Sequence, residues 1–159
     1  MNTKSWRATY IDLCESVFRE LGFDPPAMLH DDNLPLAMEI EVDERNFELL
    51  HSSADRPHQI LILCQLDSSA ENISRSELSS MLSKNLDNIR RFLPYYGINS
   101  DTQAVVSISV VALADLQANT LLEKLKSISQ DVLFWREQLD TSSADARGVK
   151  ADSQGVMLA

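Results

Sequence analysis

The sequence has 159 residues, with 24 Asp and Glu against 14 Lys and Arg, so its formal net charge is -10 at pH 7. A chain this acidic is a poor partner for nucleic acid or an anionic membrane surface, because binding to either depends on Lys and Arg. The length suffices for one domain with its own core, and the apolar fraction of 44% is ordinary for a globular protein.

Two features of the sequence favour the cytoplasm. Cys14 and Cys64 lie within apolar patterns, so we interpret both as unpaired, small hydrophobic residues in a reducing compartment. The first residues lead directly into a polar amphipathic pattern, without the apolar region of a signal peptide. We therefore expect a soluble cytoplasmic protein.

The first expected element is an amphipathic helix over 5–21. Its apolar residues recur at helical spacing from Trp6 to Leu21. Gly22, followed by a pair of prolines at 25–26, ends the pattern.

Three strands are expected next. Apolar and mostly acidic residues alternate over 36–42, which predicts a strand with one solvated face. Asp43 and Glu44 turn the chain into a second strand over 46–50. A third strand over 59–66 is apolar at nearly every position, so we expect it at the centre of the sheet and covered on both faces.

The middle of the chain predicts a helix over 76–86 and then an ambiguous stretch over 89–98. That stretch could extend the helix, but Pro94 opposes a helix and favours a strand at a sheet edge, which is our prediction. A further strand over 103–111 alternates Val, Ile and Val with serines.

The last expected helix begins with a capping box at Thr120 and Glu123. Its apolar stripe consists of Leu121, Leu125, Ile128, Val132, Trp135 and Leu139. Residues 140–159 are small and polar without a pattern, which predicts a disordered tail after a single domain over 1–139. The order of elements predicts an α+β fold, an antiparallel five-stranded sheet packed with three helices in the order α-β-β-β-α-β-β-α.

The polar residues do not form a recognisable catalytic, metal or nucleotide motif. His30, His51 and His58 fall in polar connections without the spacing of metal ligands, so we expect them at the surface. The serines match no nucleophile motif, and we place those of the 103–111 strand on its solvated face. The glycines do not cluster into a phosphate-binding loop. We expect no catalytic residue, no cofactor and no metal.

The apolar residues in and beside the first helix and first strand are more numerous than one small core obviously needs. Two readings stay open. These residues complete the core, or some of them line a groove for an extended apolar partner. The candidate groove residues are Phe18, Leu21, Met38 and Ile40, with Tyr95 and Tyr96 on the edge strand as further candidates.

This arrangement resembles the class I type III secretion chaperones, also called the Tir chaperone or CesT family, over roughly residues 5–139. The segments that carry the resemblance are the helix end Phe18-Arg19-Glu20-Leu21-Gly22, the acidic turn Asp31-Asp32-Asn33, the apolar strand over 60–64 and the close Phe134-Trp135-Arg136-Glu137-Gln138-Leu139. One departure is that residues 88–101 are aromatic and basic, where the family commonly has a glycine-rich turn.

The resemblance implies a homodimer without enzymatic activity. Such a protein binds the N-terminal segment of a secreted effector in extended form in the bacterial cytoplasm, and keeps it soluble and competent for secretion. The expected partners are the effector, a second copy of the chain, and the secretion apparatus with its ATPase. The competing function is a regulatory dimer that sequesters an activator or anti-activator of secretion genes.

The dimer contact is expected on the middle helix, because an apolar stripe on a short helix needs packing and can meet its own copy across a two-fold axis. The stripe consists of Leu78, Met81, Leu82 and Leu86.

Overall fold

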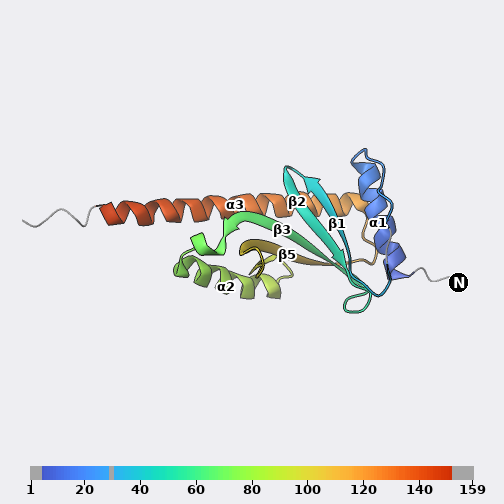
Figure 1. Ribbon diagram of the computed structural model, residues 1–159, viewed down its shortest axis with the longest axis horizontal. Coiled ribbons are helices and arrows are strands. Elements are labelled where there is room, and N and C mark those ends of the chain that lie inside the picture. The colour runs from blue at the N-terminus through green and yellow to red at the C-terminus, as the bar shows by residue number, and fades with distance from the viewer. Residues whose placement is uncertain (1–4, 29–30, 152–159) are drawn as a thin grey trace, which may run out of the picture.

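The computed structural model describes residues 5–28 and 31–151, except for the side chains at 67–68 and 135–151 (Figure 1). Within these residues the chain forms three α-helices, one short 3-10 helix and five strands. In chain order they are α1 (Trp6–Glu20), β1 (Leu36–Val42), β2 (Arg45–His51), β3 (Gln59–Ser69), η1 (Ala70–Asn72), α2 (Arg75–Arg90), β4 (Tyr95–Ile98), β5 (Ala104–Ala112) and α3 (Ala118–Ala151).

The strands form one antiparallel sheet in the order β1-β2-β3-β5-β4. This confirms the predicted fold class and order of elements. It also confirms the central place of β3 and the edge position of β4. Figure 1 shows α3 as one long helix that runs along the sheet and continues past it. Helix α1 packs against α3, and α2 packs against β4 at one edge of the sheet.

Local signals set both ends of α1. The Ser5 hydroxyl accepts a hydrogen bond from the backbone N–H of Ala8 and caps the first turn. At the other end Gly22 has a φ of 80°, and the N–H of Phe23 donates to the carbonyl of Phe18 at 2.9 Å. These bonds form a Schellman motif, for which glycine is favoured because it adopts positive φ without strain. The predicted first helix is confirmed.

The β1–β2 hairpin closes through a two-residue turn. Asp43 and Glu44 have φ values of 50° and 60°, and Val42 pairs with Arg45 across the turn. Two consecutive positive φ values identify a type I′ turn, whose twist matches that of the flanking strands. The predicted strand over 36–42 is confirmed, since Met38, Ile40 and Val42 are buried while the residues between them are exposed.

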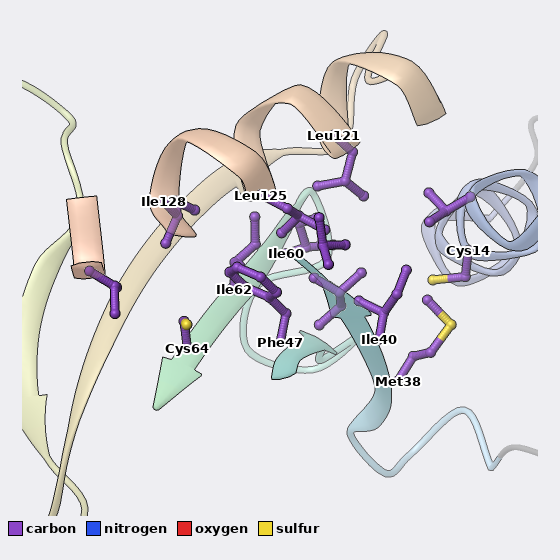
Figure 2. Close-up of a cluster of buried hydrophobic side chains, with 14 of the residues drawn as sticks. Cys14, Met38, Ile40, Phe47, Ile60, Ile62, Cys64, Leu121, Leu125 and Ile128 are labelled. Atoms are coloured by element: carbon purple, nitrogen blue, oxygen red, sulfur yellow. The ribbon is translucent and has the colours of Figure 1, made fainter. Parts of the chain in front are cut away.

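The core lies between one face of the sheet, α3 and α1. Figure 2 shows Ile60 and Ile62 of β3 beneath Leu121, Leu125 and Ile128 of α3. The apolar stripe predicted for the last helix is confirmed as far as Val132, which is fully buried. The side chains of Trp135 and Leu139 lie outside the described residues.

The two faces of β5 are the reverse of the prediction. Ser107 and Ser109 lie on the covered face and are 2% and 4% exposed. Val106, Ile108 and Val110 point to the opposite face and are only half-buried. The pairing with β3 decides this, because Cys64 lies across from Ser107 and Ile62 from Ser109, and both β3 residues face the core. The serines were therefore wrongly placed on the solvated face.

The same register corrects the prediction that β3 is covered on both faces. Ile60, Ile62, Cys64 and Leu66 are buried, but the intervening Leu61 and Leu63 are half-exposed. Within the described residues, the second face of the central strand is apolar and incompletely covered. We call it the open face, and it consists of Leu50, Leu61, Leu63, Tyr95, Val106, Ile108 and Val110.

Helix α2 is longer than predicted at both ends. Ser74 and Glu77 form a capping box at its start, and the helix runs to Arg90. The predicted strand over 89–98 therefore begins only at Tyr95, after a turn in which Phe92 has a φ of 56°.

Helix α3 differs from the prediction at both ends. It begins at Ala118, so Thr120 lies inside the first turn and does not cap the helix. It also continues to Ala151, well into the segment 140–159 that we expected to be an unpatterned, disordered tail. A helix anchored by its first half gains one backbone hydrogen bond per added residue, and this segment has no proline to stop it.

Candidate functional site

Strand β1 forms one outer edge of the sheet. Val42 and Arg45 flank the two-residue turn, so they form a hydrogen-bonded pair. In an antiparallel pair of strands such bonded residues alternate with unbonded ones. The backbone N–H and C=O groups of Val42, Ile40 and Met38 therefore bond to β2, and those of the residues between them point away from the sheet. The outward groups belong to Ala37, Glu39 and Glu41, and they have no hydrogen-bond partner among the described residues. This edge is free to accept an extended chain as a further strand.

An apolar groove lies beside this edge. Its volume is about 380 Å³, and it is bounded by the end of α1, the segment 26–28 and the start of β1. The large apolar side chains in its lining are those of Phe18, Met28, Leu36 and Met38. The first three are half-buried, so a bound segment can contact them without rearrangement of the core.

The six residues predicted to bind a partner do not lie together in one site. Phe18 lines the groove and Leu21 is half-buried on the same helix, whereas Met38 and Ile40 are 7% and 6% exposed and belong to the core. Figure 2 shows Met38 and Cys14 on the side of the core nearest α1.

Tyr95 and Tyr96 lie on β4, at the opposite edge of the sheet from β1. Tyr96 is 7% exposed and packs in the core, while Tyr95 is half-buried on the open face.

Met28 and Leu36 complete the groove, although neither was among the six candidates. They flank the polar turn between α1 and β1, so no helical or strand period connects them to Phe18. Their only sequence signal is that they are apolar residues close to turn residues.

Negative charge surrounds the β1 edge. Glu39 and Glu41 are exposed, and Asp43 and Glu44 follow in the turn. Glu39 also lies directly across from Glu48 on β2, an arrangement that is unfavourable for two like charges. Positive side chains on a bound segment would relieve this repulsion.

The predicted stripe on α2 divides between two faces of the helix. Met81 is 4% exposed and belongs to the core, and Leu78 is half-buried. Leu82 and Leu86 are 69% and 55% exposed. At 3.6 residues per turn, positions 78, 81, 85 and 88 face inward while 82, 86 and 89 form the neighbouring, outward face. The outward part of α2 is exposed and the open face is incompletely covered, so both are apolar surfaces that a partner could bury.

A buried polar cluster fastens α1 to the sheet. Arg7 is 3% exposed, and its guanidinium donates to the Leu34 carbonyl at 2.6 Å and to the Ser53 hydroxyl at 3.2 Å. The Tyr10 hydroxyl donates to the Leu49 carbonyl at 2.6 Å. Arg7 thus holds the segment that leads into β1, so the cluster positions the open edge.

His51 belongs to this cluster, so its predicted surface position is wrong. It is fully buried, stacks on Tyr10 with ring centroids 5.1 Å apart, and pairs through Nε2 with the Pro57 carbonyl at 3.0 Å. His58 is exposed, as predicted, and His30 lies outside the described residues.

The buried Cys14 is not a reactive thiol. Burial raises the pKa of the Cys14 thiol to about 12, so the thiol stays protonated and unreactive at neutral pH. Among the described side chains, no group of three His, Cys, Asp or Glu residues lies close enough together to hold a metal ion.

We expect the protein to lose stability on mild acidification because of His51. Burial lowers the pKa of His51, and the nearby Arg7 charge lowers it further. In the unfolded chain a histidine has a pKa of about 6.5. Between that pH and the lower pKa of the folded state, the unfolded chain binds more protons than the folded chain. The free energy of unfolding is therefore undiminished above pH 6.5 and falls as the pH decreases toward the folded-state pKa. Urea unfolding at pH 7 and pH 5 should show a larger loss for the wild type than for His51→Phe.

The matched control for this experiment is His58→Phe. It makes the same substitution at an exposed position, so it shows how much of the effect comes from adding a phenyl ring rather than from losing the buried His51. An equal loss of stability in the wild type and His51→Phe would contradict the assignment.

Comparisons with known proteins find proteins of similar structure. No model of a known protein family matches the sequence, and no curated protein matches it. Among solved structures, the ExsC-ExsE complex matches with a TM-score of 0.67 and 15% identity over 86% of this chain and 97% of that chain. The HopA1-SchA chaperone-effector complex matches with a TM-score of 0.60 and 19% identity over 81% of this chain and 94% of that one.

The Yersinia pestis type III secretion chaperone SycH, in complex with a fragment of YscM2, matches with a TM-score of 0.58 and 16% identity, over 79% of this chain and 98% of that chain. The chain has the fold of type III secretion chaperones. The resemblance noted in the sequence is therefore confirmed at the level of the fold.

The same fold also occurs in an uncharacterized protein from Methanothermobacter thermautotrophicus, with a TM-score of 0.52 and 14% identity. The fold alone therefore does not specify the function, which has to be argued from the residues of the site. Within the described residues, no helix combines the length and the apolar character needed to span a membrane.

Proposed function

We propose that the protein is a cytoplasmic type III secretion chaperone without enzymatic activity, which binds the N-terminal segment of a secreted effector in extended form. The observation that carries this proposal is the unpaired edge of β1 beside the apolar groove. The fold shared with a chaperone-effector complex supports it.

The effector segment adds to the sheet as a strand next to β1. Its backbone bonds to the outward groups of Ala37, Glu39 and Glu41, and its apolar side chains enter the groove at Phe18, Met28 and Leu36. Ordering a disordered segment costs several kcal/mol, roughly 2–5 or more, of the interaction energy. Backbone and groove contacts together offset that cost, whereas neither surface is large alone.

The charge around the edge specifies the kind of segment. Glu39 and Glu41 lie beside the strand that would be added, and the whole chain carries a net charge of -10. The preferred segment therefore alternates apolar residues with Lys or Arg. Its affinity should fall as the salt concentration rises, since exposed charges are screened within about 10 Å at 0.1 M salt.

The protein acts as a homodimer, in which a second copy covers the open face and the exposed part of α2. Of the dimer residues predicted from the sequence, Leu82 and Leu86 are exposed and would contact the second copy. Met81 is buried and anchors the helix in the core. One self-complementary contact covers the apolar surface of both copies at once. The ATPase of the secretion apparatus, a further partner implied by the resemblance, would receive the loaded dimer.

The decisive experiment captures the partner from native cytosol with the wild type and with Ala37→Pro. Proline removes the outward N–H of Ala37, which the free edge does not use but an added strand needs. We expect the wild type to retain a secreted effector through its N-terminal segment, and Ala37→Pro to lose at least about 1 kcal/mol of affinity, or fivefold.

Ala37→Gly is the matched control, because it changes the same side chain and keeps the N–H. Retention of the partner by Ala37→Pro at the wild-type level would contradict strand addition at β1. Recovery of a transcriptional regulator in place of an effector would favour the regulatory function.

A further inference from the structure

The opposite edge of the sheet, on β4, is already occupied at Tyr96 by a side chain. The Asn85 side chain on α2 forms two hydrogen bonds with the backbone of Tyr96. Its Nδ2 donates to the Tyr96 carbonyl, and its Oδ1 accepts from the Tyr96 N–H, each at 2.7 Å. An amide that both donates to and accepts from one residue repeats the hydrogen bonds that a neighbouring strand would make.

The outward position just before β4 is closed as well. Pro94 has no N–H, and its carbonyl accepts a hydrogen bond from Asn88 Nδ2 at 2.6 Å. From Pro94 to Tyr96, every backbone group that points away from β5 therefore has a partner or does not exist.

The sequence of α2 places these amides where they are needed. Met81, Asn85 and Asn88 follow one another at intervals of four and three residues, so they share the inward face of the helix. Met81 is anchored in the core, and Asn88 is 9% exposed. Asparagine is a poor helix former, and a buried amide is costly unless it is bonded, so packing alone does not account for two asparagines on this face.

The two edges of the sheet thus differ in their capacity to accept a strand. The outward groups of Ala37, Glu39 and Glu41 on β1 have no partner among the described residues and lie beside the groove, whereas the outward groups of Pro94 and Tyr96 at the β4 edge are bonded to α2. An exposed edge is a template for pairing with any extended chain, including a second copy of the same protein.

We propose that Asn85 determines which edge of the sheet binds the partner, by occupying β4 as a substitute strand and confining strand addition to β1. The closure of β4 follows from the fold alone, while its consequence for the effector rests on the proposed function. Asn88 assists by bonding the carbonyl of Pro94.

Amide hydrogen exchange in the free protein tests the closure directly. In Asn85→Ala, the Tyr96 N–H loses its acceptor, and its exchange should accelerate about tenfold or more. Amides at the centre of the sheet, such as those of Ile62 and Ser109, should keep their rates. Asn85→Asp retains an acceptor for the Tyr96 N–H, so most of the protection of this amide from exchange should remain. A side chain that only filled space would not distinguish Asp from Ala in this way.

Sedimentation velocity tests the consequence for strand pairing. At high protein concentration, Asn85→Ala should form larger species than the wild type through its newly opened β4 edge. Asp87→Ala, a change at an exposed position on the same helix, is the control and should sediment like the wild type.

Three results would overturn the proposal: unchanged Tyr96 exchange in Asn85→Ala, a uniform acceleration across all strands, or faster Tyr96 exchange without any added association. Neither measurement uses an effector, so these failures are distinct from a failure of effector binding at β1.

Discussion

Phe18→Glu should abolish effector binding in a protein that remains folded, whereas Met38→Glu should unfold it. Both residues line the groove, but Phe18 is half-buried and Met38 is 7% exposed. A carboxylate at Phe18 stays hydrated until a partner arrives, and then costs at least about 2 kcal/mol, or thirtyfold in affinity. A carboxylate at Met38 enters the core and should cost at least about 3 kcal/mol of stability.

Thermal melts paired with capture of the effector measure both effects. Phe23→Glu is the matched control, because Phe23 is 63% exposed just beyond α1 and does not line the groove. It should melt and bind like the wild type. If folded Phe18→Glu retained the effector fully, Phe18 would be removed from the binding site. If Met38→Glu remained stable, the groove would extend deeper than the structure indicates.

Ile108→Glu should dissociate the homodimer while leaving each chain folded. Ile108 lies on the open face between Leu63 and Tyr95, its partners in the sheet register. Its side chain is only half-buried within one chain, so a charge there can stay hydrated in a monomer. In a dimer that covers this face, the same charge would be buried without a partner and should weaken association about a hundredfold or more.

Sedimentation equilibrium at micromolar concentration measures the association. Leu82→Asp, at the exposed part of α2, should act in the same direction. Ile98→Glu is the control, because Ile98 is 45% exposed but shares the covered side of the sheet with its register partner Val105. A wild type that sediments as a monomer would disprove the dimer, and a dimeric Ile108→Glu would remove the open face from its interface.

Much of the fold follows from local and periodic signals in the sequence. The cap at Ser5 and the stop at Gly22 bound α1, and the alternation over 36–42 predicts β1, because these signals involve residues close in the chain. The order of helices and strands follows in the same way, since each period of 3.6 or 2 is visible within its own segment. A groove between the first helix and first strand was foreseeable only in part, through Phe18 and Met38.

Only the tertiary structure decided which face of β5 is buried. The alternation of Val106, Ile108 and Val110 with serines indicates two faces of β5, but the apolar face is the one left open. The register with β3 places the serines beside Cys64 and Ile62 under α3, and no signal within β5 encodes that pairing.

The proposed binding edge depended on tertiary contacts in the same manner. Asn85 and Asn88 are unremarkable polar residues in the sequence, and their role appears only when α2 lies against β4. The sequence by itself determined the elements and their order, because those depend on neighbouring residues. The fold decided which strand edge is open and which apolar surface is free, because both depend on pairings between residues far apart in the chain.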